Sequence, residues 1–339
     1  MKKKCALITG ISGMDGSHLA DYLLEKNYYI YGLIRRNATR DLGNAKHLED
    51  NKNIDIVEGD VTDMSSILRI IQRTRPHEIY NFAAQSHVGT SFEQPIATFN
   101  INLLSIVNIL ECVKSLGYST RIWHAATSEM FGSSLPPQNE DTLLNPVSPY
   151  AIAKVASYNM IKLYREAYNM FCCSGITFNH EGPRRGPLFV TRKISLAVAN
   201  IMAGNQKKLI MGNISAKRDW GWAPEYVEAF HLMLQRPTPK DYVVATGEMY
   251  SVEDFIRESF KFVNIENWED YVEFDRFLLR PSEVEELQGD ASLIKKDLGW
   301  ESKIKFNELV NRMVEHDLKL VGLNPNDYTD KGRDENASD

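Results

Sequence analysis

The sequence has little of what marks several classes of protein. Only four of its 339 residues are cysteines, and Cys5, Cys112, Cys172 and Cys173 do not have the spacing of metal ligands. They lie in apolar runs, as buried thiols do in a reducing compartment, so we expect a cytoplasmic protein without a bound metal. There is no excess of basic residues: 39 lysines and arginines face 45 aspartates and glutamates. The net charge of −6 argues against binding to nucleic acid.

Long apolar runs and biased segments are also scarce. No apolar run approaches the roughly 18 residues needed to span a bilayer, so we expect no segment that could cross a membrane and no membrane contact. The basic start, Met1–Lys4, is followed by an apolar stretch that breaks at Gly10 without a small-residue cleavage site, which argues against a secretory signal. The chain has no internal repeat, and its 43% hydrophobic and 25% charged residues are typical of a globular protein. Its length leaves room for about two domains.

The first half of the chain alternates short β-branched runs with amphipathic stretches. We expect strands at Cys5–Thr9, Tyr28–Ile34, Ile54–Glu58, Glu78–Ala83, Arg121–Ala126 and Phe171–Phe178, and helices at Met14–Lys26, Met64–Thr74, Ile96–Leu116 and Ser148–Tyr168. This alternation predicts an α/β fold with a Rossmann-type, doubly wound parallel sheet, whose ligands collect at the carboxyl ends of the strands. The expected domains are a sheet domain at 1–178, a smaller, mixed lobe at 179–323 that can interleave with it, and a disordered acidic tail at 324–339.

Three glycines, Gly10, Gly13 and Gly16, follow the first strand and open the first helix. At this spacing the first allows a tight turn, the second lets the backbone approach a pyrophosphate, and the third lets the helix pack closely. The start of the helix offers amide donors and a partial positive charge to an anion. The turn therefore predicts a dinucleotide site that also uses Ser12, Met14 and Asp15.

The end of the second strand discriminates between nicotinamide cofactors. An NAD site needs an acidic residue there, but the segment 32–40 has none and carries Arg35, Arg36 and Arg40 instead. Guanidinium groups suit the 2′-phosphate of NADP, which is the cofactor we expect. A solvated loop or a subunit contact is the alternative use of these arginines. The following strand ends supply further cofactor contacts at Asp60, Val61, Phe82, Ala83, Ala84, Gln85 and Ser86.

A phenol and an ammonium group lie four residues apart at Tyr150 and Lys154, and therefore on one face of a helix. The ammonium favours the phenolate and lowers the phenol pKa from about 10, and it can also hold the nicotinamide ribose. The hydroxyl of Thr127, at the preceding strand end, can share the substrate's proton with Tyr150. A surface helix pair is the alternative interpretation. Asn102, polar within an apolar helix, is either a structural partner near this network or an asparagine that bends the helix or is satisfied within the core.

Glu129 lies two positions beyond Thr127 at the same strand end. A site that only moves hydride needs the hydroxyl, the phenol and the lysine. An added carboxylate provides a second base, which suits removal of a proton from the carbon beside a newly made ketone. The alternative roles are a helix cap or a loop salt bridge.

The chain resembles the extended short-chain dehydrogenase/reductase superfamily and, within it, the GDP-mannose 4,6-dehydratase family, from about Ala6 to Val314. The most specific segments are 8–17, 127–132, 178–186, 189–194, 217–221 and 280–284. The resemblance implies oxidation of GDP-D-mannose at C4 by Tyr150 and NADP, elimination of water across C5/C6 with Glu129 as base, and hydride return to C6. The product is GDP-4-keto-6-deoxy-D-mannose, a precursor of GDP-6-deoxyhexoses such as GDP-fucose or GDP-rhamnose.

The same resemblance implies roles for residues of both lobes. It places His180 and Arg185 against the cofactor. It implies a homodimer built on the helices Ile96–Leu116 and Ser148–Tyr168, or a homotetramer in which dimers also pair through the loop Arg35–Arg40. The residues that it assigns to the substrate are Ser86, Thr127, Ser128, Glu129, Asn179, Val190, Lys193, Arg218, Arg280 and Glu283.

Three residues depart from the pattern of the family. Met14, Ala97 and Gly182 stand where the family commonly has Gln, an aromatic residue and Ser.

Other functions stay open. The alternative functions are another nucleotide-sugar dehydratase, a 4-epimerase of the same fold, and an NADP-binding sensor or scaffold without activity. An epimerase has no use for Glu129. Relatives that act on dTDP-glucose usually carry Asp before this Glu, so Ser128 favours the guanosine sugar.

Overall fold

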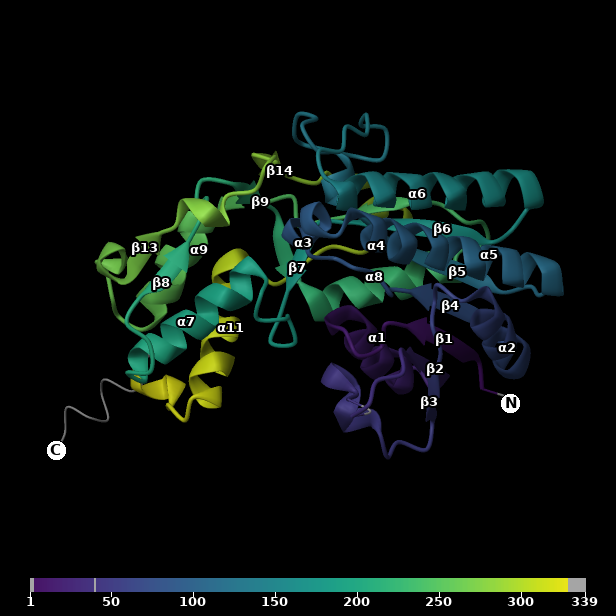
Figure 1. Cartoon of the computed structure of the whole chain (residues 1–339), viewed down its shortest axis with the longest axis horizontal. Helices are drawn as coiled ribbons and strands as arrows, with labels where there is room; N and C mark the ends of the chain where they lie inside the picture. The colour runs from purple at the N-terminus through teal and green to yellow at the C-terminus, as the bar shows by residue number, and fades with distance from the viewer. Residues whose placement is uncertain (1–2, 40, 329–339) are drawn as a thin grey trace.

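A computed structural model describes residues 3–39 and 41–328, which form a larger and a smaller lobe side by side (Figure 1). The larger lobe is built on a seven-stranded parallel sheet in the order β11-β6-β5-β4-β1-β2-β3. Its strands are β1 (Cys5–Thr9), β2 (Tyr29–Ile34), β3 (Ile54–Glu58), β4 (Glu78–Asn81), β5 (Arg121–Thr127), β6 (Cys172–Thr177) and β11 (Tyr242–Val244). The predicted Rossmann-type sheet is confirmed.

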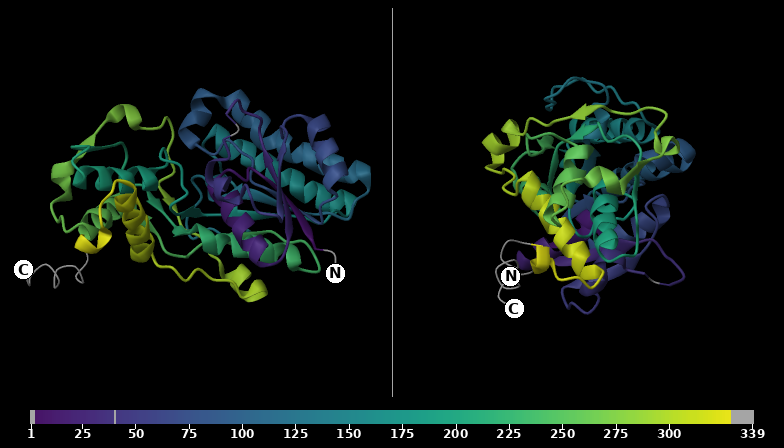
Figure 2. Two further views of the ribbon diagram at one scale, coloured as in Figure 1. Left: turned by 90° about the horizontal axis from the view of Figure 1, so that it is seen from below. Right: turned by 90° about the vertical axis from the view of Figure 1, so that its left-hand side faces the viewer.

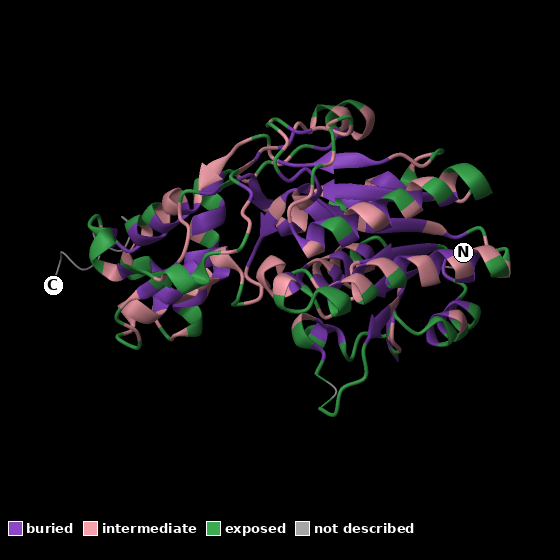
Figure 3. Ribbon diagram, turned by 45° about the horizontal axis from the view of Figure 1, so that its top comes forward, coloured by how far each residue is buried: buried purple, intermediate pink, exposed green. Residues whose placement is uncertain are grey.

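The central strands are apolar along most of their length because helices cover both faces of the sheet. Figure 3 shows these strands buried, while the helices expose only their outer faces. The chain winds outward in both directions from β1, which pairs with β2 on one side and β4 on the other. A crevice forms where the winding reverses, at the carboxyl ends of β1 and β4.

Two groups of helices flank the sheet, as Figures 1 and 2 show. One face carries α1 (Met14–Glu25), α8 (Ala223–Gln235) and α10 (Ser292–Leu298), and the other carries α2 (Met64–Thr74), α5 (Ser105–Leu116) and α6 (Pro149–Tyr168). Short α3 (Val88–Glu93) and α4 (Pro95–Phe99) precede a π-helical segment, η2 (Asn100–Leu104), which continues into α5. The predicted helix 96–116 is therefore continuous but changes its winding in the middle.

The helix Pro95–Leu116 is long and apolar enough to cross a membrane by length and composition alone, with a mean hydropathy of 1.6. The expectation that no segment meets this criterion is wrong, because isolated polar residues such as Asn102 and Asn108 interrupt the apolar run without lowering its mean far. Core helices of soluble proteins meet the same criterion. This helix packs against α2 and α6 within the larger lobe.

The smaller lobe packs three helices around its own apolar core, which includes Trp220, Phe255 and Phe306. The helices are α7 (Val190–Met202), α9 (Val252–Phe262) and α11 (Phe306–Leu320). Short strands form three small sheets: β7 (Asn179–Glu181) with β10 (Trp220–Trp222), β9 (Lys217–Arg218) between β12 (Tyr250–Ser251) and β14 (Glu286–Leu287), and β8 (Leu209–Met211) with β13 (Val272–Phe274).

The two lobes interleave along the chain, as the predicted division at residue 178 allowed. The chain leaves the larger lobe near residue 178 and returns to it with α8, β11 and α10. The predicted disordered tail begins too early at 324, because Pro325–Tyr328 form a short helix and Tyr328 packs on the core of the smaller lobe. The rest of that tail, 329–339, lies outside the described residues.

Candidate active site

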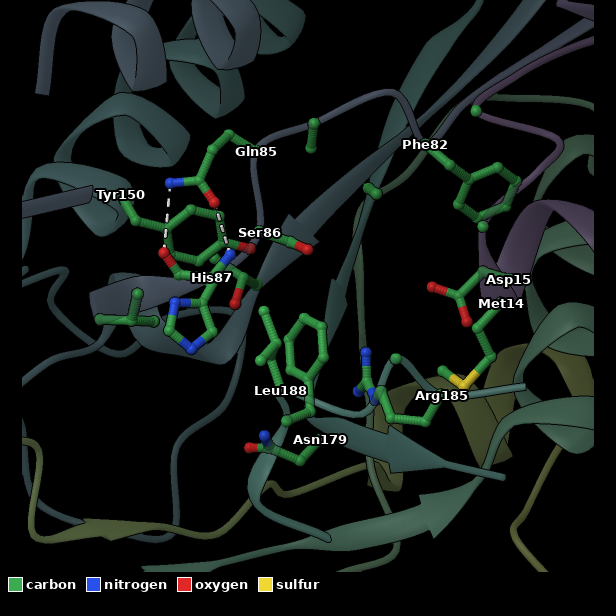
Figure 4. A pocket seen from close by; sticks show the side chains of 18 of the residues that line it. Met14, Asp15, Phe82, Gln85, Ser86, His87, Tyr150, Asn179, Arg185 and Leu188 are labelled. Atoms are coloured by element: carbon green, nitrogen blue, oxygen red, sulfur yellow. Dashed lines mark hydrogen bonds between the residues drawn. The ribbon is translucent and has the colours of Figure 1, made fainter. Parts of the chain in front are cut away.

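A cavity of about 1240 Å³ opens at the carboxyl ends of the sheet strands and takes its walls from both lobes. Every residue predicted for the cofactor, the substrate or catalysis lines it, except Arg36, which is exposed outside it. Figure 4 shows how Asp15, Gln85, Tyr150 and Arg185 surround this space from different elements. The fold thus brings together residues that are up to 273 positions apart in the sequence, Gly10 and Glu283.

The glycine turn has the close packing that its spacing predicts. Gly10 has a left-handed φ of +70°, and a Cβ on Gly16 would lie 2.4 Å from the carbonyl oxygen of Gly10. Gly13 donates its amide to that same oxygen at 3.0 Å and begins α1. Among the described residues no side chain caps this helix, so its first amides are available to an anion. The turn fits a dinucleotide pyrophosphate.

The loop after β2 folds back onto this turn. The amide of Asn44 donates to the carbonyl oxygen of Ser12 at 3.1 Å. Exposed Arg35 lies at the rim of the cavity, whereas Arg40 lies outside the described residues. Asp60 lines the cavity after β3, and its carboxylate accepts hydrogen bonds from the amide and hydroxyl of Thr62 at 2.8 and 2.7 Å.

The loop after β4 is fixed by the π-helical segment. Asn102 is 1% exposed; its side chain accepts from the amide of Gln85 at 2.9 Å and donates to the carbonyl of the same residue at 3.0 Å. The Gln85 side chain donates to the Thr98 hydroxyl at 3.0 Å. It also donates to the carbonyl of His87 at 3.1 Å and accepts from the amide of His87 at 2.6 Å (Figure 4). Asn102 is therefore a buried asparagine within a change of helix winding, and its side-chain bonds hold the loop after β4 rather than reach Tyr150 or Lys154.

Strand β5 ends at Thr127, and a single 3-10 turn follows it at Ser128–Met130. The Thr127 hydroxyl accepts from the amide of Glu129 at 3.3 Å and caps this turn. The Glu129 carboxylate lines the cavity, with a side chain that is 12% exposed. The turn thus places a hydroxyl and a carboxylate at one wall of the site.

The phenol of Tyr150 does not have the lowered pKa that the sequence suggested. Burial raises the pKa of Tyr150 to about 12; a hydrogen bond with Thr127 opposes this rise, and the Glu129 carboxylate adds to it. Lys154 has its ammonium 6.0 Å from the centre of the phenol ring and donates to the carbonyl of Ala125 at 2.8 Å. Burial also lowers the pKa of Lys154 to about 8. Desolvation therefore changes the pKa values of Tyr150 and Lys154 more than the attraction between phenolate and ammonium does.

A network of charges connects Glu129 with the smaller lobe. The Arg218 guanidinium lies 3.9 Å from the Glu129 carboxylate and 3.2 Å from that of Glu283. Arg280 also pairs with Glu283, at 3.0 Å. Half-buried Lys193 lines the same region, and burial lowers its pKa. Three cations thus converge on one part of the cavity, which suits a diphosphate.

One ion pair joins the glycine turn to the start of the smaller lobe, and a second lies within that start. Nε2 of His180 lies 3.0 Å from the carboxylate of Asp15. Burial opposes the charge on His180, but the carboxylate prevails and raises the pKa of the imidazole. Arg185 bonds Glu181 through two nitrogens, at 2.6 and 3.0 Å, and its guanidinium stacks over Phe189.

Unsatisfied polar atoms also point to a ligand. Within the described part of the chain, Oδ1 of Asn179 is buried without a hydrogen-bond partner and faces the cavity (Figure 4). A buried acceptor without a partner is costly unless a ligand supplies a donor. Asn179 therefore offers a buried acceptor to a polar ligand on the substrate side of the cavity, in addition to the groups that fit a dinucleotide.

Sequence reasoning missed several residues of the cavity wall. His87, whose Nδ1 accepts from the amide of Thr90 at 3.1 Å, packs edge-on against Phe189 at 5.8 Å between ring centres. Asn44 and Leu188 also line the cavity. His87 follows Ser86, and Leu188 precedes the segment 189–194, both of which the sequence analysis assigned to the site. Their position beside these segments could therefore have identified them. Nothing in the sequence marks Asn44, because its place depends on how the loop folds back.

The strand order, the glycine turn and the Tyr150/Lys154 helix define the extended short-chain dehydrogenase/reductase class. Two solved structures share this fold. dTDP-glucose 4,6-dehydratase of Bacillus anthracis in complex with NAD is 22% identical, with a TM-score of 0.81 over 93% of this chain and 97% of that one. RMD of Pseudomonas aeruginosa complexed with NADPH is 20% identical, with a TM-score of 0.77 over 94% of this chain and 100% of that one.

A sequence model of GDP-mannose 4,6 dehydratase matches residues 7–313. GDP-mannose 4,6 dehydratase 1 of Arabidopsis thaliana is 47% identical over 329 residues, which cover 94% of this chain and 91% of that protein. The chain belongs to the GDP-mannose 4,6-dehydratase family.

Proposed function

We propose that this chain converts GDP-mannose to GDP-4-keto-6-deoxymannose and water, with NADP as its resident cofactor. The observation that carries the proposal is the presence of a second base, Glu129, in one cavity with Thr127, Tyr150 and Lys154. Family membership supports the substrate and the reaction. When bound, the nicotinamide supplies the hydride acceptor at C4, the hydride for C6, and a positive charge that favours the phenolate.

Tyr150 removes the proton of the C4 hydroxyl, with the Thr127 hydroxyl as its partner. A phenol with a pKa of about 12 is a weak base in the ligand-free protein, so proton removal depends on cations brought close to it. Lys154 is one such cation, on the same face of α6, and it also binds the ribose. The pair is therefore active only in the loaded enzyme.

Glu129 removes the proton at C5. The C4 ketone acidifies this carbon, and loss of hydroxide from C6 completes the elimination of water. Arg218, 3.9 Å from the carboxylate, keeps it on the wall of the cavity. Arg218, Arg280 and Lys193 hold the diphosphate, whose negative charge they match, while Asn179 accepts a hydrogen bond from the nucleotide sugar.

Replacement of Glu129 by Gln tests the assigned reaction. Glu129→Gln keeps the size and polarity of the side chain but cannot take a proton, so we expect oxidation at C4 without loss of water. Absorbance of the reduced nicotinamide in a single turnover measures the first step, and mass spectrometry of the sugar measures the second. Glu283→Gln is the matched control, because it loosens Arg218 and Arg280 and should raise KM more than it lowers kcat. Unchanged water loss in Glu129→Gln would contradict the proposal.

The preference for NADP rests on Arg35 at the cavity rim and on the absence of an acidic residue in 32–39. Arg35→Glu replaces a partner of the 2′-phosphate with a charge that repels it and that suits the 2′-hydroxyl of NAD. We expect the Kd for NADP to rise by at least about tenfold more than the Kd for NAD. Fluorescence titration with both cofactors measures the difference, and equal losses would exclude the assignment.

We also propose a dimer and a cytoplasmic location. α4, η2 and α6 expose large apolar side chains on the outside of the larger lobe, among them Ile96 (73% exposed), Leu104 (42%) and Leu163 (51%). A second copy of the chain that packs its own helices on this face would bury them. The buried thiols of Cys112, Cys172 and Cys173 support a reducing compartment.

A further inference from the structure

A row of buried polar side chains runs across three neighbouring strands of the sheet, β1, β4 and β5, beneath the cavity. Thr9 is level with Asn81 in the pairing of β1 and β4, and Asn81 is level with His124 in the pairing of β4 and β5. Neighbours at one level of a parallel sheet point to the same face. Each of the three is at most 1% exposed. Polar groups buried this deeply are costly unless all of them are bonded.

The hydrogen bonds along this row run in one direction. The amide of Ala83, in the loop that lines the cofactor side of the cavity, donates to the Thr9 hydroxyl at 3.1 Å. That hydroxyl donates to Oδ1 of Asn81 at 2.6 Å. The Asn81 amide nitrogen therefore lies toward Nδ1 of His124 and donates to it at 3.1 Å. Nδ1 is an acceptor and carries no proton.

The row continues from His124 into the catalytic helix. Burial, together with the charge of Lys154, holds the pKa of His124 well below its usual range, so the ring is neutral and its one proton is on Nε2. Nε2–H donates to the hydroxyl of Ser157 at 3.0 Å, and this hydroxyl donates to the carbonyl of Lys154 at 2.9 Å. The next residue on β5, Ala125, accepts from the Lys154 ammonium. Adjacent residues of β5 thus hold both the backbone and the ammonium of Lys154.

We propose that His124 is a positioning residue for the dehydratase reaction. As a neutral Nε2–H imidazole it connects the strand ends beside the cofactor with the turn of α6 that carries Lys154. This inference rests on the proposed function, because it gives Lys154 a catalytic task. An apolar residue of similar size would fill the same space but would leave the Asn81 side-chain nitrogen without its acceptor and the Ser157 oxygen without its donor. A glutamine would supply the acceptor and the donor again.

The kinetic test compares two pairs of variants. His124→Leu breaks the row, and we expect kcat to fall by about 10- to 100-fold, as for a misplacement of about 1 Å, with little change in the KM of GDP-mannose. His124→Gln should restore kcat to within a few fold of the wild type. Ser157→Ala removes one oxygen from the row and should lower kcat in the same way. Its control, Ser174→Ala, changes a buried serine level with His124 on β6 whose hydroxyl has no partner among the described residues, and should leave kcat unchanged.

A second readout does not depend on the substrate. ¹⁵N NMR of protein labelled at histidine should show a neutral Nε2–H imidazole that stays neutral at about pH 6.5, where an ordinary histidine titrates, and whose signal is missing in His124→Gln. An imidazolium or an Nδ1–H tautomer would overturn the proposal, and so would a wild-type kcat in both His124→Leu and Ser157→Ala. A wild-type protein that forms no ketone from GDP-mannose but has the expected tautomer would contradict the proposed function and not the placement of His124.

Discussion

At the scale of single residues, Lys154 combines a catalytic position with a cost in stability. The residue is 3% exposed, and burial lowers its pKa from 10.5 to about 8. A shift of this size corresponds to a penalty of about 3 kcal/mol while the side chain is charged. The folded protein tolerates the charge because the site needs a cation beside Tyr150.

Lys154→Met should therefore abolish activity and still raise the free energy of unfolding at pH 7, by about 1–3 kcal/mol. The unfolded chain binds this proton more tightly than the folded one, so the penalty is fully present below pH 8 and disappears as the pH rises to 10.5. The advantage of the variant should shrink above pH 8. Denaturant unfolding at pH 7 and pH 9.5 measures it; a variant that is less stable at pH 7, or an advantage that does not change with pH, would contradict the argument.

Sequence and structure differ in what they show of the residues. Thr127, Glu129 and Tyr150 were visible in the sequence because strand ends and a helical spacing of four define where such groups meet. The pKa of Tyr150 was not, since burial is a property of the folded protein and here exceeds the effect of Lys154. The bonds that hold Glu129 beside Arg218 also join segments that are far apart in the chain.

At the scale of elements, the glycine turn is the least tolerant segment of the cofactor site. In Gly16→Ala the new Cβ would lie 2.4 Å from the carbonyl oxygen of Gly10, so the turn or α1 must move. We expect a lower Tm and a Kd for NADP raised by about tenfold or more. Scanning fluorimetry and fluorescence titration measure the two effects.

Gly117→Ala is the control for this prediction. Gly117 ends α5 with φ +64°, and among the described residues no atom lies within 4 Å of the point that a Cβ would occupy there. Alanine there costs about 1 kcal/mol of backbone strain. Its affinity for NADP should be that of the wild type. Equal affinities in both variants would show that the packing of Gly16 does not shape the cofactor site.

Most elements of the larger lobe were predictable from the sequence. The elements that were missed depend on contacts between residues that are not neighbours in the chain. β1, β3 and α2 have the predicted bounds, since each has a clear apolar pattern between turn residues. The π-helical turn around Asn102 was not predictable, because it depends on the contact with Gln85. The end of the smaller lobe was also missed, because Tyr328 is ordered by a core that is built from distant segments.

At the scale of the whole molecule, the outer face of α4–α6 determines the proposed assembly. Leu104→Glu combined with Leu163→Glu places two charges on this face, and we expect the molar mass in solution to fall from that of a dimer to that of one chain. Leu135→Glu is the control and should remain dimeric. Leu135 is equally apolar and 85% exposed, but it lies in a loop away from the face of α4–α6. Light scattering measures all three; a wild-type monomer would contradict the proposed dimer.

The arrangement of the two lobes was only partly predictable. The alternation of strands and helices predicts one parallel sheet and a separate second lobe. It does not show that α8, β11 and α10 return to the sheet, because their short apolar runs suit either core. The cavity therefore lies between lobes whose chain crosses from one to the other several times.

The central claim is that a carboxylate takes the C5 proton of a keto sugar and water leaves. The most direct measurement is the mass and proton NMR spectrum of the sugar nucleotide that forms from GDP-mannose in D₂O. The account predicts a product that has lost one water and carries one deuterium at C5, and no such product from Glu129→Gln. A product that keeps all of its oxygens, or that retains protium at C5, would contradict it.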